Sequence, residues 1–467
     1  MMKKYKLNSN HKKIIADTLT PVSAYLKLRD LFPNSLLLES SDYDGRTNNY
    51  SYICCNPIST ISIKNNDLKI TYPDGKNIIK KNLKNNEIPK QIESFSKKFD
   101  CKKYKYKFIT NGLFGYIAHE AVSYFEKIKL NKKKKDLEIP DIYYAVYKNI
   151  IAISLFSHEA HIFSHNFNED DNLNQIERVL KTSKITKYNF KKSGKELSNL
   201  TDNQFIDFVN KGKKHCYRGD VFQIVLSRRF SQNFTGDEFN VYRALRSINP
   251  SPYLFFFDYG NFKIFGSSPE AQLIIENKKA EIHPIAGTFK RTGNDKKDKE
   301  TAIKLSKDPK ENSEHVMLVD LARNDLSRNG TNIIVEKNRE IQFFSHVIHL
   351  VSKVTGKINK NSKTFQVVAD TFPAGTLSGA PKHKALQLID LYEKNARNFY
   401  GGAVGYMDFY GNFNHAIIIR SFLSKNKNLY YQAGAGIVSD SVPENELQEV
   451  YNKLGALNKA LIYAEKI

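Results

Sequence analysis

The sequence predicts an α+β fold built on antiparallel sheets, with its helices in separate blocks. In the first ~165 residues, short β-rich runs alternate with turn signals, and few helical periods interrupt them. In the remainder, hairpin-like strand pairs stand next to long helical segments instead of alternating with them one by one. This arrangement favours α+β over a doubly wound parallel sheet.

The N-terminal part is predicted to be mostly antiparallel sheet. Its expected strands lie at 49–63, 68–77, 108–120, 143–156 and 161–167. A polar stretch without apolar periodicity follows and predicts a linker at 181–200. We therefore expect an N-terminal, mostly β region at 1–180 and a second region at 201–467.

The second region opens with a helical pattern for which Thr201 or Asp202 is the expected N-cap. Strands and helices then follow as distinct segments. The expected strands lie at 220–230, 252–260, 416–423 and 428–438, and the expected helices at 310–326, 380–393 and 444–461.

The formal net charge of +23 raises the question of nucleic-acid binding. The lysines are scattered over polar, Asn-rich stretches, and no zinc finger, basic zipper or RNA-recognition signature is present. No GxGxxG motif follows a strand, and no GxxxxGK[ST] motif occurs, so nucleotide binding has no motif support. We interpret the charge as a solvated surface and expect no nucleic-acid partner.

The remaining bulk properties predict a cytoplasmic protein. The mean hydropathy is −0.50, and no apolar run approaches the roughly 20 residues of a membrane span. The N-terminus lacks the apolar stretch and cleavage site of a secretory signal. The four cysteines show no metal-ligand spacing and are expected to be ordinary thiols in a reducing compartment.

Two glutamate pairs with the same spacing lie near the starts of two predicted helices. Glu311 and Glu314 form one pair, and Glu446 and Glu449 form the other. Carboxylates three residues apart share a helix face and repel each other unless a positive charge lies between them. The pairs suit Mg²⁺, with Glu314 and Glu449 as direct ligands and Glu311 and Glu446 holding metal-bound waters. The alternative is two exposed helix faces with ordinary ion pairs.

Glycine-rich loops at 371–382 and 432–441 lie between the two pairs, and a further one at 284–293 precedes the first pair. Small residues let backbone N–H groups approach an anion closely. Arg420 is expected inside an apolar strand, where a guanidinium needs an acidic partner, either an internal carboxylate or a ligand. Together these features predict a small polyanionic carboxylate held partly through a metal.

These segments carry a family resemblance that runs nearly from end to end of the chain. The motifs are "GDVFQIVLSRR", "NPSPYLFFFD", "GSSPE", "PIAGT", "EHVMLVDLARNDL", "PAGTLSGAPK", "GGAVGY" and "QAGAGIVSDSVPENE". In these motifs the chain resembles the chorismate-utilising enzymes, and among them the anthranilate synthase component I family. The resemblance implies large antiparallel β-sheets forming a sandwich-like core flanked by helices.

The resemblance also implies chemistry on chorismate, with Mg²⁺ chelating the ring carboxylate. By position, Glu314 and Glu449 resemble the metal ligands, and Glu311 and Glu446 their supporting shell. Glu270 in "GSSPE" occupies the place of the general acid that protonates the departing C4 hydroxyl. Such a residue works best with a raised pKa, which partial burial would supply.

Other matching positions imply the substrate pocket. Tyr400 and Arg420 resemble the pair that holds the enolpyruvyl carboxylate, and His349 is expected beside the ring, where it helps proton loss and pyruvate elimination. Thr376 joins the catalytic set. The remaining implied lining residues are Gly287, Thr288, Gly434, Ala435, Gly436 and Lys453.

Two positions bear on which nucleophile attacks the ring. Family members that add water carry a lysine base where this chain has Gln223, and an amide cannot accept a proton at neutral pH. Members that make aminodeoxychorismate often carry a nucleophilic lysine where this chain has Ala286. The resemblance therefore implies direct attack by ammonia, with aminodeoxychorismate synthase component I as the alternative and a water-adding enzyme less favoured.

Two further segments resemble the tryptophan feedback site of anthranilate synthases. The matching residues are Glu39, Ser40, Pro252, Tyr253 and Leu254. A strand-end Glu–Ser pair can bind an ammonium group, and Pro–Tyr offers an apolar wall. The chain carries no glutaminase nucleophile in a GxCxG-type turn, so we expect a separate glutamine amidotransferase subunit as the source of ammonia.

Overall fold

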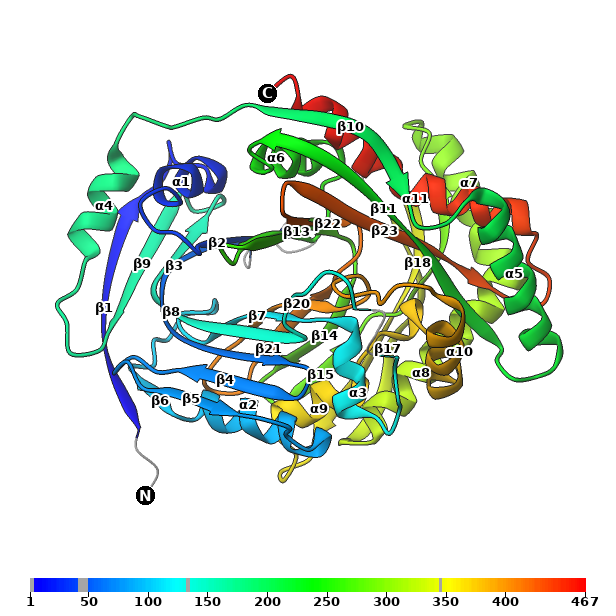
Figure 1. Ribbon diagram of the computed structural model, residues 1–467, viewed down its shortest axis with the longest axis horizontal. Helices are drawn as coiled ribbons and strands as arrows, with labels where there is room; N and C mark the ends of the chain where they lie inside the picture. Colours follow the sequence, from blue (N-terminus) through cyan, green and yellow to red (C-terminus); the bar gives the residue numbers. More distant parts are fainter. Residues whose placement is uncertain (1–3, 41–48, 132–134, 344–346) are drawn as a thin grey trace.

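The computed structural model describes residues 4–40, 49–131, 135–343 and 347–467, and its strands form two stacked layers (Figure 1). The first layer is the upper sheet in the figure. In the order of pairing, its strands are β10 (Phe190–Ser198), β11 (Gln223–Gly236), β23 (Asn428–Ile437), β22 (Ser421–Lys425), β13 (Phe262–Ser268), β12 (Tyr253–Asp258) and β2 (Leu36–Ser40).

The second layer follows the same antiparallel rule. Its strands are, in order, β17 (Gly330–Phe343), β18 (Val347–Ile358), β15 (Lys279–Ile282), β14 (Ala271–Glu276), β21 (Phe413–Ile417), β20 (Ala403–Met407) and β7 (Leu113–Ile117). β16 (Ile285–Lys290) also pairs with β18, beyond the segment that β15 occupies.

Two long strands join the layers. β3 (Tyr50–Lys64) pairs with β2 of the first layer and with β8 (Ile142–Ser154), which in turn pairs with β7 of the second. The sheet continues beyond them through β4 (Asp67–Thr71), β5 (Asn77–Lys80), β9 (Glu159–Asn166), β1 (Tyr5–Ile15) and β6 (Phe99–Cys101). Within the described ranges only β1 and β6 pair in parallel.

The apolar residues between the layers explain why both stay together. Leu36 and Leu38 of β2, Phe255 of β12 and Phe114 and Tyr116 of β7 belong to one buried cluster drawn from both layers. Alternate residues of each strand point into this space, as in other stacked sheets. The α+β class and the sandwich-like core with flanking helices are confirmed.

Helices cover the outer faces of both layers. They are α1 (Pro21–Leu28), α2 (Ile88–Ser96), α3 (Val122–Phe125), α4 (Leu173–Lys181), α5 (Asp202–Tyr217), α6 (Phe239–Ile248), α7 (Asp295–Lys307), α8 (Pro309–Ser327), α9 (Thr364–Thr371), α10 (Lys382–Tyr392) and α11 (Pro443–Ala464). Short 3₁₀ turns are η1 (Asn85–Glu87), η2 (His119–Ala121) and η4 (Gly375–Leu377), and β19 (Gly379–Ala380) is a two-residue strand beside β11. α5, α7, α8, α10 and α11 gather at the right of Figure 1.

The helix predictions match the structure closely. The helices expected at 310–326, 380–393 and 444–461 are α8, α10 and α11. Thr201 is the N-cap of α5, and its side chain and that of Gln204 form a capping box. Pro443 occupies the first turn of α11, where a missing N–H costs nothing.

Two local predictions were wrong. Residues 190–198, expected within a linker, form edge strand β10, whose side chains are exposed apart from Phe190 and a few half-buried positions, so no apolar alternation announced it. The strand expected at 416–423 is broken between β21 and β22. Arg420 lies in that break with a left-handed φ of 50°.

The two regions expected from the sequence share hydrogen-bonded strands. Leu38 of β2 faces Phe255 of β12, and Gly115 of β7 faces Gly405 of β20. Among the helices that the structure describes, none is both long and apolar enough to cross a membrane.

Candidate active site

Glu270 lies in the turn between β13 and β14 and is buried. Its Oε1 accepts a hydrogen bond from the Thr376 hydroxyl of η4 at 2.9 Å. Burial raises the pKa of Glu270 to about 8, although the Thr376 hydrogen bond and the nearby charge of Lys453 oppose the rise. At neutral pH the Glu270 carboxyl group therefore carries a proton that it can donate.

Gln223, the first residue of β11, contacts the N-terminal part of α8. Its Nε2 donates a hydrogen bond to Oε1 of Glu314 at 2.7 Å. A Cβ at Gly436 of β23 would lie 2.6 Å from Gln223 Nε2 and 3.8 Å from Glu314 Oε1. A side chain at Gly436 would displace the Gln223 amide, so β23, β11 and α8 meet closely around this amide and the Glu314 carboxylate.

Glu311 lies one turn earlier on α8 and approaches Gly287 of β16. Gly287 has a φ of 67°, and a Cβ there would lie 3.0 Å from Glu311 Oε2. The Gly287 carbonyl accepts a hydrogen bond from Nδ1 of His349 at 2.8 Å, so the lone pair of the His349 ring is on Nε2. Burial lowers the pKa of His349 to about 4, which makes it a neutral but weak base. Thr288 is in β16, but its side chain is outside the described part.

Lys453 connects the first half of α11 to β23. Its Nζ lies 2.6 Å from Glu449 Oε1 and donates to the Gly434 carbonyl at 2.8 Å. The Lys453 carbonyl accepts a hydrogen bond from Nη1 of Arg420 at 3.1 Å. Burial lowers the pKa of Arg420, while the nearby Tyr400 and Glu449 favour its charged form. Arg420 and Lys453 thus form a cationic corner of the site.

Tyr400 completes that corner. Burial raises its pKa to about 12, so the phenol is neutral and can donate a hydrogen bond. Gly434 and Gly436, which contact Lys453 and Gln223, are two residues apart on β23, about 7 Å along the strand. Ala435 between them is fully buried. β23 therefore brings the surroundings of Glu314 and Glu449 to one stretch of strand, although the two glutamates lie on different helices.

The four glutamates do not form a closed cluster. In the described part of the chain, no three His, Cys, Asp or Glu side chains lie close enough together to hold a metal by themselves. Mg²⁺ usually takes only one or two carboxylates and completes its octahedron with waters and substrate oxygens. The oxygen-only donor set fits that mode, and Glu446 is buried in the first turns of α11.

The five residues expected in a regulatory site come together. In the register between β2 and β12, Ser40 faces Tyr253 and Glu39 faces Leu254. Glu39, Ser40, Pro252 and Tyr253 line a cleft of about 1570 Å³. The Leu254 side chain is buried behind it.

The Glu39 carboxylate already has internal partners that the sequence did not reveal. Arg246 of α6 donates to both of its oxygens, at 2.8 and 3.0 Å, and the Tyr242 hydroxyl donates at 2.5 Å. Sequence reasoning also missed Arg397. It is fully buried and pairs with Glu393, and the i, i+4 spacing in "EKNAR" was the available signal.

Comparison with known proteins identifies the family of the chain. Residues 36–459 match the family model described as chorismate binding enzyme. The chain belongs to the chorismate-binding enzymes. Among curated members of this family, anthranilate synthase component 1 of Aquifex aeolicus (strain VF5) is 35% identical over 97% of this chain and 94% of the relative. The protein of that name from Neisseria meningitidis serogroup A is 37% identical over 96% and 93%.

Two solved structures show the same fold as this chain. Anthranilate synthase component I from Streptococcus pneumoniae TIGR4 is 29% identical, covers 96% of this chain and 99% of its own, and superposes with a TM-score of 0.73. The menaquinone-specific isochorismate synthase of Escherichia coli is 17% identical, with a TM-score of 0.72 and coverages of 99% and 96%. At that identity the second likeness concerns the fold alone.

Proposed function

We propose that this chorismate-binding enzyme is the chorismate-aminating component of an anthranilate synthase, acting in tryptophan biosynthesis. It converts chorismate and ammonia to anthranilate, pyruvate and water. The observation that carries the proposal is the position of Gln223, whose amide contacts Glu314 and cannot activate a water molecule. The near-full-length likeness to relatives named anthranilate synthase component 1 supports it.

Glu270 would act as the general acid. Ammonia attacks C2 of the ring, the double bonds shift, and the C4–O bond breaks. The departing hydroxyl takes the Glu270 proton and leaves as water. The raised pKa of about 8 keeps that proton on Glu270 at neutral pH, and the Thr376 hydroxyl fixes the orientation of the carboxyl group.

Elimination of pyruvate completes the reaction. The C2 proton leaves, the C3–O bond to the enolpyruvyl group breaks, and the enolpyruvyl methylene gains a proton to give pyruvate. His349, neutral and with its lone pair on Nε2, would assist the proton loss. A base with a pKa of about 4 suffices only because aromatisation of the ring drives this step.

Substrate binding is assigned to the cationic corner and the metal ligands. Arg420 and Tyr400 would hold the enolpyruvyl carboxylate, since a guanidinium fork matches a carboxylate in shape and charge. Gly287, Thr288, Gly434, Ala435, Gly436 and Lys453 would line the pocket. Mg²⁺ would be held by Glu314 and Glu449, with Glu311 and Glu446 through water, and would supply positive charge for the ring carboxylate.

The proposal includes two partners. A separate glutamine amidotransferase subunit would supply ammonia, and tryptophan would bind in the cleft at Glu39, Ser40, Pro252, Tyr253 and Leu254 as a feedback inhibitor. The Arg246–Glu39 contact supports such coupling, because α6 packs against α11, the helix of Glu446 and Glu449.

A fluorescence assay tests the function. The purified chain, given chorismate, Mg²⁺ and an ammonium salt, should form anthranilate, and EDTA should stop the reaction. Glu314→Gln and Glu449→Gln should each lose activity by orders of magnitude while staying folded. Glu444→Gln, at an exposed position of the same helix as Glu449, is the matched control and should keep full activity.

Three outcomes would contradict these assignments. If Glu314→Gln or Glu449→Gln reacted at the wild-type rate at low Mg²⁺, the metal assignment would be wrong. Formation of aminodeoxychorismate without anthranilate would favour the alternative, which Ala286 argues against because it cannot act as a nucleophile. Turnover of glutamine by the purified chain alone, at low free ammonia, would remove the need for an amidotransferase partner.

A further inference from the structure

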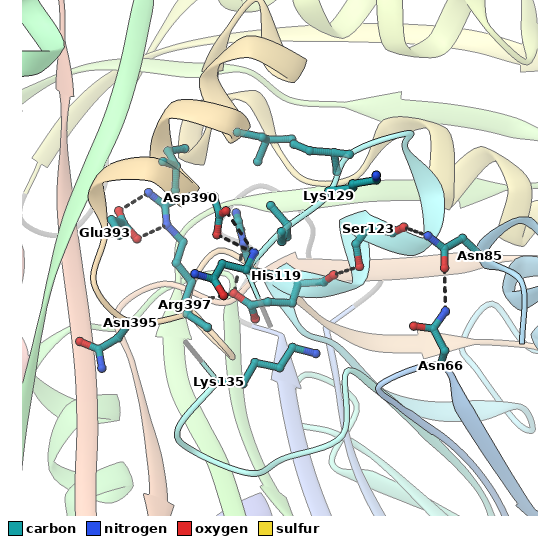
Figure 2. Close-up of a pocket in the computed structure, with 17 residues that line it drawn as sticks. Asn66, Asn85, His119, Ser123, Lys129, Lys135, Asp390, Glu393, Asn395 and Arg397 are labelled. Carbon is teal, nitrogen blue, oxygen red and sulfur yellow. Dashed lines mark hydrogen bonds and ion pairs between the residues drawn. The ribbon is translucent and has the colours of Figure 1, made fainter. Parts of the chain in front are cut away.

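A cavity of about 300 Å³ lies between η2 and the C-terminal end of α10 (Figure 2). Its inner end is formed by His119, Glu120, Glu393 and Arg397, and its outer rim by residues that include Lys129 and Asn131. None of the residues assigned above to catalysis or to tryptophan binding lines it.

The cavity contains two buried polar atoms that lack a partner. Nε2 of His119 and Oε2 of Glu120 form no hydrogen bond with any part of the chain that the structure describes. The two residues are 3% and 6% exposed. Leaving a buried acceptor unsatisfied destabilises the folded state, and more so when the acceptor is charged. Two such atoms on adjacent residues indicate a ligand.

The other atoms of the two side chains define what the ligand must offer. Oε1 of Glu120 accepts the backbone N–H of Arg397 at 2.8 Å. Nδ1 of His119 lies 3.6 Å from that same oxygen, which favours a proton on Nδ1 and a lone pair on Nε2. Both unpartnered atoms are then acceptors, so the ligand has to be a donor.

The buried charges favour a cation. Glu120, Glu393 and Arg397 are the buried charged residues at the inner end, so carboxylates outnumber guanidinium groups by two to one. The Arg397 guanidinium donates to both oxygens of Glu393, at 2.6 and 2.9 Å, and to the carbonyls of Leu377 and Val225. Its charge also acts on Glu120 through space, but one guanidinium balances only one of the two carboxylates. Lys135, nearer the rim, pairs with Asp141 at 2.5 Å. One buried carboxylate therefore has no balancing positive charge, which a small monovalent cation with hydrogen-bond donors would supply.

The cavity lies directly behind the proposed catalytic loops. A Cβ at Gly401 would lie 3.4 Å from Cδ2 of His119 and 3.6 Å from Cβ of Leu377. Gly401 follows Tyr400 in the chain, and Leu377 follows Thr376. Only one layer of side chains thus separates the cavity from the residues that would surround the substrate.

We propose that this cavity binds an ammonium ion between Oε2 of Glu120 and Nε2 of His119 and holds it as a reserve for the amination. The ion carries one positive charge and four N–H donors, which match the two acceptors and the excess negative charge. Its role in supplying ammonia rests on the proposed function, whereas its binding does not.

Steady-state kinetics of the purified chain test the supply role. The ionic strength is held with tetramethylammonium chloride, whose cation has no N–H donor. Glu120→Gln should raise the KM for ammonium about tenfold, with kcat at saturating ammonium and the KM for chorismate unchanged within about twofold. Glu138→Gln, which removes the same charge from an exposed position, is the control and should change none of them.

A crystal of the wild-type chain soaked in thallium(I) acetate tests binding without any turnover. Thallium(I) should give an anomalous peak next to Oε2 of Glu120, and ammonium chloride should displace it. This measurement stands if no anthranilate is formed or if Glu120→Gln does not fold. Absence of the peak, or an unchanged KM for ammonium in folded Glu120→Gln, would overturn the proposal.

Discussion

At the scale of single residues, Glu270 sets the pH dependence that we expect for catalysis. Burial raises its pKa to about 8, so the acid form is available below that pH and lost above it. At constant free ammonia, kcat/KM for chorismate should fall about tenfold per pH unit on the alkaline side of pH 8. Free ammonia must be held constant because it titrates in the same range.

The pH profile of kcat/KM in Thr376→Val is the matched comparison with the wild-type profile. The Thr376 hydrogen bond opposes the rise of the Glu270 pKa, so its removal should move the alkaline limb to higher pH. A wild-type profile that stays flat well above pH 8 would exclude Glu270 as the proton donor.

The raised pKa of Glu270 also predicts that Glu270→Gln is more stable than the wild type although it is inactive. Between the ordinary pKa of 4.5 and the folded value of about 8, the unfolded chain has lost a proton that the folded chain keeps. The free energy of unfolding of the wild type should therefore fall as pH rises through this range. Glu270→Gln removes this slope, so the inactive variant should be more stable at pH 8, by roughly a few kcal/mol at about 1.4 kcal/mol per pKa unit.

Urea unfolding of both proteins at pH 5 and pH 8 measures this difference, and both pH values fall within the range of interest. Parallel pH dependences in the wild type and Glu270→Gln would show that Glu270 ionises normally in the folded protein.

At the scale of elements, Arg397 connects segments that are far apart in the chain. It joins α10 through Glu393, η4 through the Leu377 carbonyl and β11 through the Val225 carbonyl. Arg397→Met would remove the positive charge that pairs with the buried Glu393, so it should lower the free energy of unfolding by about 3–5 kcal/mol. The exposed pair Arg323–Asp320 provides the control, since Arg323→Met should cost about 1 kcal/mol or less.

Urea unfolding gives both values. If the free energy of unfolding falls no more in Arg397→Met than in Arg323→Met, the buried ion pair does not stabilise the fold. The contacts of Arg397 with the two carbonyls would then be dispensable for holding η4.

The contact of β2 with β12 predicts how the proposed feedback inhibition could be removed. Ser40 faces Tyr253 at the cleft, so Ser40→Phe would fill the space proposed for tryptophan. The variant should keep the activity with ammonium and lose inhibition by tryptophan. Ser193→Phe, on edge strand β10 at the other end of the first layer, is the control and should remain inhibited.

Inhibition is measured as anthranilate formation against tryptophan concentration. Unchanged inhibition in Ser40→Phe would remove the proposed regulatory site. Loss of activity without tryptophan would mean that β2 supports catalysis directly.

At the scale of the whole molecule, the order of elements was predictable because periodicity is local. α8 begins at Pro309 and ends at Ser327, against an expected 310–326, because its apolar spacing lies within the helix and its cap, Asp308, directly precedes it. β10 was missed because an exposed edge strand needs no apolar face. The break at Arg420 was missed because "AIIIRSFL" is equally apolar on both sides.

The site was predictable as a set of residue types but not as a set of contacts. Family motifs pointed to Gln223 and Glu314, yet their hydrogen bond joins residues 91 positions apart and depends on how α8 packs. Glu39 likewise gave no sign of Arg246, which comes from another helix. The cavity at His119 and Glu120 is formed by two distant segments, neither of which has a recognisable motif.

The last prediction concerns whether the two sequence regions fold as one cooperative unit. β2 and β7, from the first region, supply edge partners to β12 and β20 of the second. Without them the second region would expose one face of the buried cluster that includes Phe255 and Phe257. We therefore expect that residues 1–200 and 201–467, produced separately, each fail to fold cooperatively, and that mixing them restores activity.

Far-UV circular dichroism in urea is the suitable measurement, because the chain contains no tryptophan to report by fluorescence. The intact chain should show one transition, since the shared strands couple both regions. A cooperative transition in either fragment, with a slope that fits its own size, would show that it has a self-sufficient core. In that case the shared strands would only dock two folded units, and the proposed coupling between the cleft at Ser40 and α11 would have to pass through that docking contact.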